Sequence, residues 1–438
     1  MKRVLIIDDE ADFRRLIGEV LRENGWEVLE AADGEAGVAL AKVQRPEVVL
    51  LDLIMPRGNG FRACRELRDD ISLAHSKIVV TSGRDFPTDR QAAIEAGADE
   101  YLTKPIDPKH LIGLLSQFSF PDKIHGDRKG GASENSSPVR IKFWGVRGSI
   151  ATPGPSTVHY GGNTSCVEVR AGNEIIILDA GTGLRMLGRA LIAEFNGRPM
   201  SLTLLLTHEH WDHIQGLPFF QPIYTPNNQL HILGFEGARA SLKSILSGQM
   251  ESSYFPIGMN EIPANVIVEE LKDVEFKVGS VNGRAFFANH PGICVGYRLS
   301  TPDGSLVYLP DNELRYQHHP DKKGSGSTTE FTRKEDEKLT GFLREADVVI
   351  MDCQYDRREY AHHIGWGHGC LEDVTELAVR ADVKKLFIFH HDPDHDDERI
   401  SQMVQTARDV AAGLKSKISI EAAREGLVVE LAAVARGG

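Results

Sequence analysis

The stretch Leu202–His213 reads LTLLLTHEHWDH and decides how this sequence is interpreted. It begins with branched apolar residues, which are typical of a buried strand, and it ends with His208, His210, Asp212 and His213. Each of these polar groups costs roughly a few kcal/mol when it is desolvated without a partner. Imidazole and carboxylate groups together are typical ligands of Zn²⁺, and also of Mn²⁺ or Fe²⁺. The stretch therefore predicts a metal site at the end of a buried strand.

Three lone polar residues further along the chain repeat this pattern. His290 follows the apolar run of RAFFANH, Asp311 follows that of SLVYLPD, and His390 follows that of KKLFIFH. Any one of them is usually an ordinary loop residue. Three such residues after an H-x-H-x-D-H cluster favour a shared site with donors for two metal ions.

The first 118 residues alternate short apolar runs with helical patterns, which gives five strand–helix units. This alternation predicts a parallel sheet with helices on both faces. Polar residues follow its strands: Asp8 and Asp9 after VLII, Asp52 after EVVLL, Thr81 after KIVV and Lys104 after YLT. Ligands bind at the carboxyl ends of parallel strands, and three carboxylates there suit Mg²⁺.

These residues, in this order, resemble the receiver domain of two-component response regulators. The resemblance implies that Asp52 is the phosphoacceptor and that a sensor histidine kinase is the phosphodonor. It also implies that Mg²⁺ is held by Asp8, Asp9, Asp52 and the carbonyl of Ile54. Thr81 and Lys104 would contact the phosphoryl group.

Residues 121–138, PDKIHGDRKGGASENSSP, are rich in Gly, Ser and charged residues and predict a flexible linker. We therefore expect a receiver domain over 1–120 and a second domain over 139–438. The second domain alternates many strands with helices, which predicts an α/β sandwich of two sheets. Within it, 276–290 is predicted as one strand, and the composition of 315–338 predicts a mobile loop.

The HEHWDH cluster with His290, Asp311 and His390 resembles the metallo-β-lactamase superfamily. GVRGS, GGNTSCVEV, LDAGTGLR and HWDHIQGLPFF resemble its phosphodiesterase branch, which includes ribonuclease Z and the cyclic phosphodiesterase of phosphonate metabolism. The resemblance implies an αββα sandwich with metals at one edge. One metal would take His208, His210 and His290. The other would take Asp212, His213 and His390, and Asp311 would bridge the two.

Two metal ions supply an activated water and neutralise charge on a phosphoryl group. By the same resemblance, Asp212 would orient the nucleophile as well as bind metal, and His368 would donate a proton to the leaving group. His391, His362 and His363 are rival proton donors. Asp179 in LDAGTG is expected to support the metal loops. Arg147 could contact a phosphate or only a backbone carbonyl.

The sequence therefore predicts a response regulator with an enzymatic output. The output is a dinuclear metal phosphodiesterase, with zinc favoured over manganese or iron, acting on a cyclic nucleotide or another small phosphodiester. Phosphorylation at Asp52 would control it. A thioester or lactone hydrolase with the same metals is one alternative, and an interaction module with a vestigial metal site is another.

The net charge of −13 argues against broad binding to RNA or to an anionic membrane surface. The five cysteines are scattered, which favours a reducing compartment. The basic start MKRVLIIDDE has too short an apolar run for a signal peptide, and no run is long enough to span a membrane. We expect a cytoplasmic protein without a membrane partner, and a homodimer remains open.

Overall fold

The computed structural model describes residues 2–55, 59–70, 73, 76–84, 86–115, 139–237, 240–314 and 326–431. The expected linker, 121–138, lies outside these residues, so the domain boundaries stay a prediction. Two compact units form, one in the N-terminal part of the chain and one in the C-terminal part. We describe each unit by itself.

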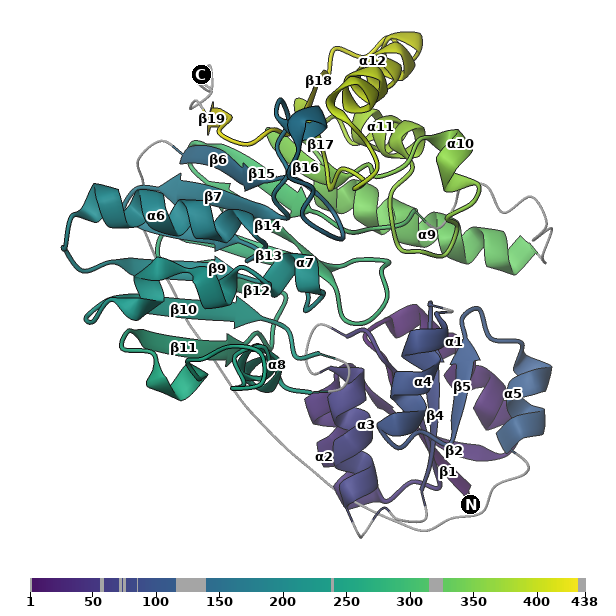
Figure 1. Cartoon of the computed structure of the whole chain (residues 1–438). Helices are drawn as coiled ribbons and strands as arrows, with labels where there is room; N and C mark the ends of the chain where they lie inside the picture. Colours follow the sequence, from purple (N-terminus) through teal and green to yellow (C-terminus); the bar gives the residue numbers. More distant parts are fainter. Residues whose placement is uncertain are drawn as a thin grey trace. The chain divides into compact units, whose positions relative to one another are not determined.

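The N-terminal unit is a five-stranded parallel sheet in the order β2-β1-β3-β4-β5 (Figure 1). The strands are β1 (Lys2–Ile7), β2 (Trp26–Ala31), β3 (Val48–Asp52), β4 (Lys77–Ser82) and β5 (Glu100–Thr103). The helices are α1 (Ala11–Glu23), α2 (Gly34–Gln44), α3 (Gly60–Asp69), α4 (Pro87–Glu95) and α5 (Pro108–Leu115). All five expected strand–helix units are present, and α1 and α5 share one core with the central strands.

The C-terminal unit contains two seven-stranded sheets (Figure 1). The first has the order β11-β10-β9-β8-β7-β6-β19 and the second β12-β13-β14-β15-β16-β17-β18. The first comprises β6 (Val139–Gly145), β7 (Cys166–Ala171), β8 (Glu174–Leu178), β9 (Ser201–Leu205), β10 (Gln229–Gly234), β11 (Asn265–Glu270) and β19 (Val428–Leu431). The second comprises β12 (Glu275–Val278), β13 (Val281–Phe287), β14 (Val295–Thr301), β15 (Gly304–Leu309), β16 (Val348–Asp352), β17 (Lys385–Phe389) and β18 (Ser419–Ala422).

Helices cover the outer faces of these sheets, and the sheets pack on each other. The helices are α6 (Gly183–Phe195), α7 (Trp211–Ile214), α8 (Leu242–Gly248), α9 (Gly326–Leu343), α10 (Arg357–Tyr360), α11 (Leu371–Arg380) and α12 (Asp397–Gly413). Residues of α6 and α8 share a core with the first sheet, and residues of α9, α11 and α12 share one with the second. Between the sheets, the ring of Phe143 lies 5.1 Å from that of Phe387. The predicted αββα sandwich is confirmed.

Two details of the predicted fold are wrong. The stretch 276–290 forms a hairpin of β12 and β13 rather than one strand, because the chain turns at Gly279, whose φ of +53° favours glycine. The expected mobile loop 315–338 is helical from Gly326 onward, as part of α9. Residues 315–325 lie outside the described part of the chain.

The carboxyl ends of several strands in the C-terminal unit meet at one edge of the sandwich. Residue 179 follows β8, residues 207–213 follow β9, residue 290 follows β13, residue 311 follows β15 and residue 390 follows β17. Because β13, β15, β16 and β17 run in the same direction, their polar ends face the same side. The fold thus gathers residues that are up to 211 positions apart, from Asp179 to His390.

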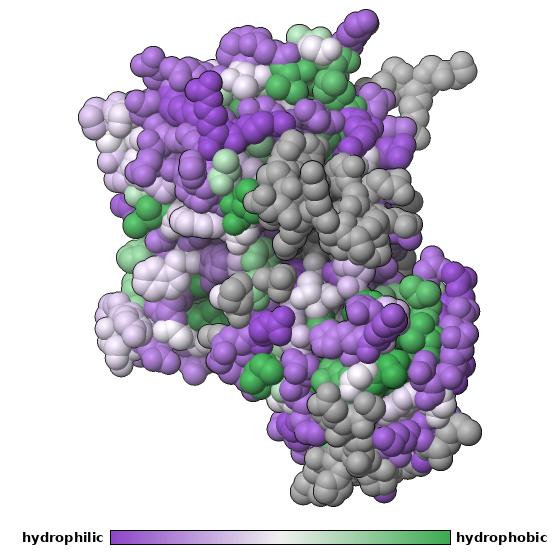
Figure 2. Space-filling model, turned by 90° about the vertical axis from the view of Figure 1, so that its right-hand side faces the viewer, coloured by the Kyte–Doolittle hydropathy of each residue, from purple (hydrophilic) through white to green (hydrophobic). Residues whose placement is uncertain are grey.

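On the face drawn in Figure 2, hydrophilic residues border the hydrophobic ones. In the described part of the chain, none of the helices has the length and apolar character needed to cross a bilayer.

Candidate functional site

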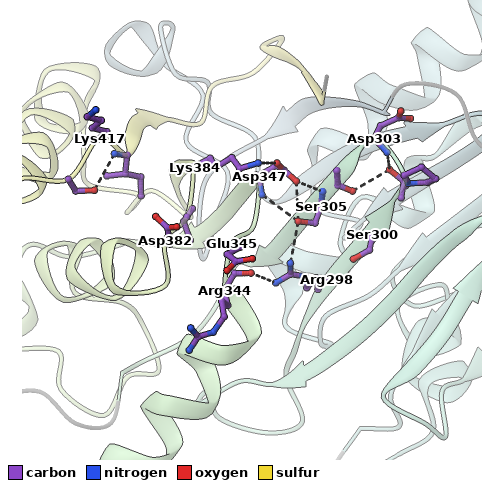
Figure 3. A pocket seen from close by; sticks show the side chains of 16 residues that line it. Arg298, Ser300, Asp303, Ser305, Arg344, Glu345, Asp347, Asp382, Lys384 and Lys417 are labelled. Carbon is purple, nitrogen blue, oxygen red and sulfur yellow. Dashed lines mark hydrogen bonds and ion pairs between the residues drawn. The ribbon is translucent and has the colours of Figure 1, made fainter. Parts of the chain in front are cut away.

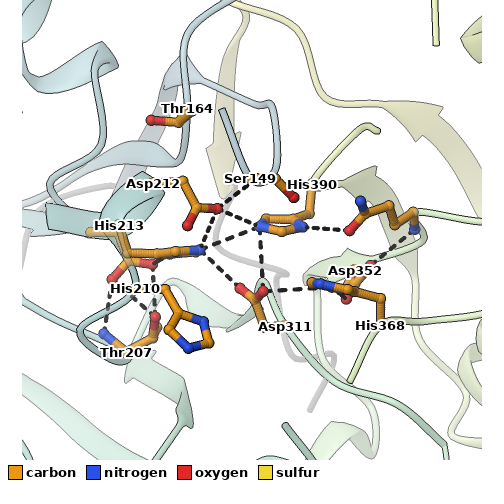
Figure 4. A network of polar contacts seen from close by, with 12 residues as sticks. Ser149, Thr164, Thr207, His210, Asp212, His213, Asp311, Asp352, His368 and His390 are labelled. Atoms are coloured by element: carbon orange, nitrogen blue, oxygen red, sulfur yellow. Dashed lines mark hydrogen bonds and ion pairs between the residues drawn. The ribbon is translucent and has the colours of Figure 1, made fainter. Parts of the chain in front are cut away.

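The histidines of the predicted metal centre turn ring nitrogens toward one another. His210 Nδ1 lies 2.9 Å from His208 Nε2 and 3.0 Å from His290 Nε2. On the other side of the cluster, His213 Nε2 lies 3.3 Å from His390 Nε2. The structure therefore brings together two groups of histidines that the sequence predicted as ligands of two metals. Figure 4 shows His210, His213 and His390 of these groups.

The second ring nitrogen of four of these histidines has an oxygen partner. His208 Nδ1 lies 3.1 Å from the Thr207 hydroxyl, and His290 Nδ1 lies 2.9 Å from the Gly367 carbonyl. His213 Nδ1 lies 2.8 Å from Asp179, and His390 Nδ1 lies 3.2 Å from Gln354 Oε1. These oxygens accept the Nδ1 protons, and in the neutral form of such a ring the lone pair of Nε2 turns inward.

Facing lone pairs at about 3 Å repel each other unless a cation lies between them. Burial lowers the pKa of His208 and of His290 well below its usual value, and neighbouring histidines add to this effect. These rings are therefore neutral and suited to bind a metal. The donor set fits two divalent ions, and hydrogen-bond partners of this kind orient ligands in metal sites.

The two carboxylates of the cluster lie among the histidines. Asp311 Oδ2 is 3.1 Å from His213 Nε2, and Asp311 Oδ1 is 3.3 Å from His390 Nε2 and 3.8 Å from His290 Nε2. Asp311 is buried, and its Oδ2 has no hydrogen-bond partner among the described residues. It can thus contribute to both ligand groups. Asp212 Oδ2 lies 3.1 Å from His390 Nε2 and accepts the Ser149 backbone N–H at 2.8 Å.

Electrostatics distinguish His213 and Asp311 from the neutral rings. Burial lowers the pKa of His213, but Asp212, Asp311 and Asp179 outweigh it and raise that pKa well above its usual value. Burial raises the pKa of Asp311, but His390, His213 and other histidines outweigh it and hold that pKa well below its usual value. Asp311 is therefore ionised, as a metal-binding carboxylate must be.

The proton-donor candidate His368 lies at the edge of this cluster. Its Nδ1 is 2.9 Å from Asp352 Oδ2 and 3.6 Å from Asp311 Oδ1. Burial lowers its pKa, but Asp352 and Asp311 outweigh burial and raise that pKa to about 9. Figure 4 shows the His368–Asp352 pair pointing toward Asp311 and His390.

The rival histidines have other contacts. His391 is buried beneath the cluster, where its Nε2 lies 3.0 Å from the Ala423 carbonyl, and burial lowers its pKa to about 3. His363 stacks on Tyr355 at 4.1 Å, and His362 is exposed. Of the four candidates, His368 has the contacts with the cluster and with a carboxylate.

A second cluster lies at the carboxyl ends of β1, β3, β4 and β5 in the N-terminal unit. One carboxylate oxygen from each of Asp8, Asp9 and Asp52 lies within 4.8 Å of the others. Lys104 Nζ lies 2.8 Å from both Asp8 and Asp52. Burial, and next the charge of Asp52, raise the pKa of Asp8 to about 7. This density of carboxylates fits a Mg²⁺ ion.

The other predicted residues of this cluster lie beside it. Asp52 pairs with Thr81 in the β3–β4 register, and the hydroxyl of Thr81 is buried without a hydrogen-bond partner among the described residues. The backbone N–H of Ile54 donates to Asp52 Oδ1 at 3.2 Å. The structure thus gathers all the residues that the sequence predicted for this site.

Comparisons with known proteins find matches to both parts of the chain. A family model for the response regulator receiver domain matches residues 4–116, and one for the β-lactamase superfamily domain matches residues 175–391. The protein PilH of Pseudomonas aeruginosa is 38% identical over 116 residues, which are 26% of this chain and 96% of PilH. The chain is a member of the response regulator receiver family. Its C-terminal part is a β-lactamase superfamily domain.

Other relatives of this response regulator match over a smaller share of their length. PhoB of Escherichia coli is 33% identical over 114 residues, and PleD of Caulobacter vibrioides is 39% identical over 117 residues. These matches cover 26% and 27% of this chain, but only 50% of PhoB and 26% of PleD. The chain therefore spans half or less of the length of these two proteins.

Three solved structures resemble the C-terminal part of the response regulator. The metallo-β-lactamase fold protein YhfI of Bacillus subtilis is 17% identical, with a TM-score of 0.48, and covers 67% of this chain and 100% of its own. A diphosphatase of the PhnP family is 16% identical, with a TM-score of 0.45, and the match covers 66% of this chain and 97% of the diphosphatase. The short form of human tRNase Z is 16% identical, with a TM-score of 0.44, and the match covers 67% of this chain and 99% of the tRNase Z chain.

Several residues of the site had no role in the sequence prediction. Asp352 follows the apolar run VVIM, and the same signal selected Asp311, so the sequence could have identified it. Gln354 and Thr207 carry no such signal.

Asp179, expected to support the metal loops, accepts hydrogen bonds from Thr207, His213 and Tyr308. Arg147 is buried and donates to the carbonyls of Gly161 and Asp392.

A pocket of about 780 Å³ lies at the other end of the response regulator's second sheet, near the first residues of β15, β16 and β17 (Figure 3). Three of its charged residues, Arg298, Asp347 and Lys384, are engaged with one another or with the backbone. Lys384 pairs with Asp347 at 2.5 Å, and Arg298 donates to the carbonyls of Phe342 and Arg344. None of the predicted metal ligands lines this pocket.

Proposed function

We propose that the C-terminal domain is a dinuclear metal-dependent phosphodiesterase that acts on a cyclic nucleotide or another small phosphodiester. The observation that carries this proposal is the position of Asp311 between two histidine groups, 3.8 Å from His290 and 3.1 Å from His213. A shared carboxylate suits two metals bound side by side. Zinc is the favoured ion because imidazole nitrogens predominate among the donors.

The metals, when bound, would supply an activated water and neutralise charge on the phosphoryl group. His208, His210 and His290 would hold one ion, and Asp212, His213 and His390 the other. The residues of the chain supply the rest. The Ser149 N–H fixes Asp212 at 2.8 Å, which leaves its second oxygen to orient a water molecule.

His368 would donate the proton that the leaving oxygen needs. Asp352 accepts its Nδ1 proton at 2.9 Å, which fixes the ring and balances the charge of the protonated form. The other ring nitrogen can then give its proton to the leaving alkoxide. Asp352 itself would not touch the substrate.

Two features support a small nucleotide as the substrate. The net charge of −13 disfavours a long polyanion such as RNA. In the sequence, Trp211 stands between the predicted ligands His210 and Asp212, and its side chain is 75% exposed. Trp366 precedes Gly367 and is 57% exposed. Exposed aromatic rings next to a metal centre can stack on a nucleobase.

Phosphorylation of Asp52 would control the enzyme, with a sensor histidine kinase as the phosphodonor. Asp52 is one of two carboxylates that contact Lys104, so a phosphoryl group on Asp52 would meet a cation already in place. Mg²⁺ bound by Asp8, Asp9, Asp52 and the Ile54 carbonyl would balance the added charge, and the Thr81 hydroxyl could bind a phosphoryl oxygen.

The test is a substrate panel with the purified protein loaded with zinc, manganese or iron. The proposal expects hydrolysis of bis(p-nitrophenyl) phosphate and of at least one cyclic nucleotide, and loss of both in Asp311→Ala. Turnover of a thioester or a lactone without turnover of the diesters would indicate a different hydrolase. Bound metal without any turnover would indicate an interaction module.

A further inference from the structure

Glu313 is a buried carboxylate that accepts hydrogen bonds from Tyr360 and from the loop 361–368. It lies two residues after Asp311 and is 5% exposed. Its Oε1 accepts the Tyr360 hydroxyl at 2.6 Å and the Gly365 N–H at 2.8 Å, and its Oε2 accepts the Gly367 N–H at 2.9 Å. Three donors thus converge on one carboxylate.

The backbone of Glu313 is tied to the segment that leads to His290. The Glu313 N–H donates to the Asn289 carbonyl at 3.0 Å, and the Asn289 side chain donates to the Glu313 carbonyl at 3.0 Å. The same residue therefore joins the segment after β13, the segment after β15 and the loop 361–368. Each of these segments carries a predicted site residue: His290, Asp311 or His368.

Gly367 forms hydrogen bonds with both Glu313 and His290. Its N–H is held by Glu313, and its carbonyl accepts the His290 Nδ1 proton at 2.9 Å. Gly367 has a φ of +87°, and a Cβ there would lie 2.5 Å from His290 Nδ1. The main chain of the loop thus lies directly against the ring, and only glycine fits between them.

We propose that Glu313 is a positioning residue for the metal held by His208, His210 and His290. It fixes Gly367, and Gly367 fixes the ring and the tautomer of His290, so that Nε2 turns toward the metal. The other metal would not depend on it, because His213 has its partner in Asp179 and His390 has its partner in Gln354. The inference rests on the metal centre of the proposed function and is independent of the substrate.

A graded set of variants tests this role. Tyr360→Phe removes one donor and leaves the two backbone bonds of Glu313. Glu313→Gln keeps one acceptor oxygen, and Glu313→Ala removes both. Gln354→Ala is the matched control, because it removes a comparable partner from a histidine of the other metal. Circular dichroism and thermal melting check that each variant folds, and Glu313→Gln remains informative if Glu313→Ala does not.

The readout is zinc affinity, measured by competition with a chromophoric chelator. The occupied positions are identified by anomalous scattering from crystals grown at buffered free zinc. We expect Glu313→Ala to weaken one zinc by about 10–100-fold, as removal of a ligand's partner typically does. That zinc should be the one at the three histidines. Tyr360→Phe should keep both affinities, and Gln354→Ala should weaken the other zinc.

Two results would overturn the proposal. Equal weakening of both zinc ions in Glu313→Ala, with melting temperature falling in step, would make Glu313 a general structural residue. Unchanged zinc affinities in the folded Glu313 variants would show that Glu313 does not position His290 for metal binding. A wild-type protein that binds no zinc would overturn the proposed function as well, so the two failures can be told apart.

Discussion

Replacement of Asp179 by asparagine should weaken the binding of one metal ion while leaving the fold intact. Asp179 is fully buried and has a φ of +60°. Asparagine has the same shape and tolerates this left-handed conformation. The substitution therefore changes the hydrogen bonding and the charge of this side chain but not its shape. One carboxylate oxygen accepts the Thr207 N–H at 2.8 Å, and an asparagine oxygen can keep this bond.

The amide nitrogen of asparagine would replace the oxygen that faces His213. That oxygen now accepts the His213 Nδ1 proton at 2.8 Å and the Tyr308 hydroxyl at 2.9 Å. The Tyr308 hydroxyl can rotate and accept a proton instead. His213 Nδ1 can do so only if its proton moves to Nε2, which lies 3.1 Å from Asp311 and 3.3 Å from His390. A protonated Nε2 cannot bind a metal.

The expected loss follows from this change of tautomer. We expect the metal at Asp212, His213 and His390 to bind about 10–100-fold more weakly, which corresponds to about 1.4–2.7 kcal/mol. The lost charged hydrogen bond costs about 1.5–3 kcal/mol of folding free energy. Removal of a buried charge offsets part of that cost.

Zinc titration against a chromophoric chelator measures this loss, with Tyr308→Phe as the control. The control removes one hydrogen bond from Asp179 and leaves the contact with His213, so it should lower the melting temperature without changing zinc affinity. Our reasoning fails if Asp179→Asn binds two zinc ions as tightly as the wild type does. It also fails if Tyr308→Phe loses zinc to the same extent.

Three further predictions concern the phosphoacceptor, the proton donor and the substrate. Acetyl phosphate with Mg²⁺ should label the wild type, and Asp52→Asn should stay unlabelled when the products are analysed by mass spectrometry. Asp352→Asn should lower kcat for a diester with an alkyl leaving group by roughly 10²–10⁴-fold. A p-nitrophenyl diester, whose leaving group needs no proton, should be affected much less, and zinc content should not change. Trp211→Ala or Trp366→Ala should raise KM for a cyclic nucleotide by about 5–150-fold, since base stacking contributes about 1–3 kcal/mol. Hydrolysis of a dialkyl phosphate without a base should be unchanged, and equal effects on both substrates would exclude stacking.

The fold could be predicted because its strands are buried on both faces. Runs such as EVVLL and EIIIL have no period, and they mark strands buried by helices on one side and by a sheet or by helices on the other. One of the two errors occurred where the signal is a single backbone angle. Gly279 divides β12 from β13 through its positive φ, and the apolar residues on either side show no break.

The site could be predicted only in part, for a related reason. A polar residue after an apolar run is visible in sequence, and this signal identified His290, Asp311 and His390. It was also present at Asp352. Glu313 carries no such signal, because its role is defined by contacts with residues 47–54 positions away. The candidate ligands can be predicted from the sequence because they stand at the ends of apolar runs. Their hydrogen-bond partners can be identified only once the fold is known.

Backbone strain gives a last argument that this edge of the sandwich is a binding site. Asp179 and His390 have φ values of +60° and +58°, and both are buried at the ends of strands. A residue other than glycine in this region costs about 1–3 kcal/mol. Folding alone would favour glycine at both positions, because glycine has no Cβ that clashes in this conformation. The side chains present instead are the partner of His213 and a histidine that faces Asp212 and Asp311. Gly148 leaves the space that the turned ring of His390 needs, because a Cβ there would lie 2.4 Å from His390 Nδ1. The strain and the glycine are consistent with the proposed ligand geometry, because they allow the ring of His390 to face Asp212 and Asp311.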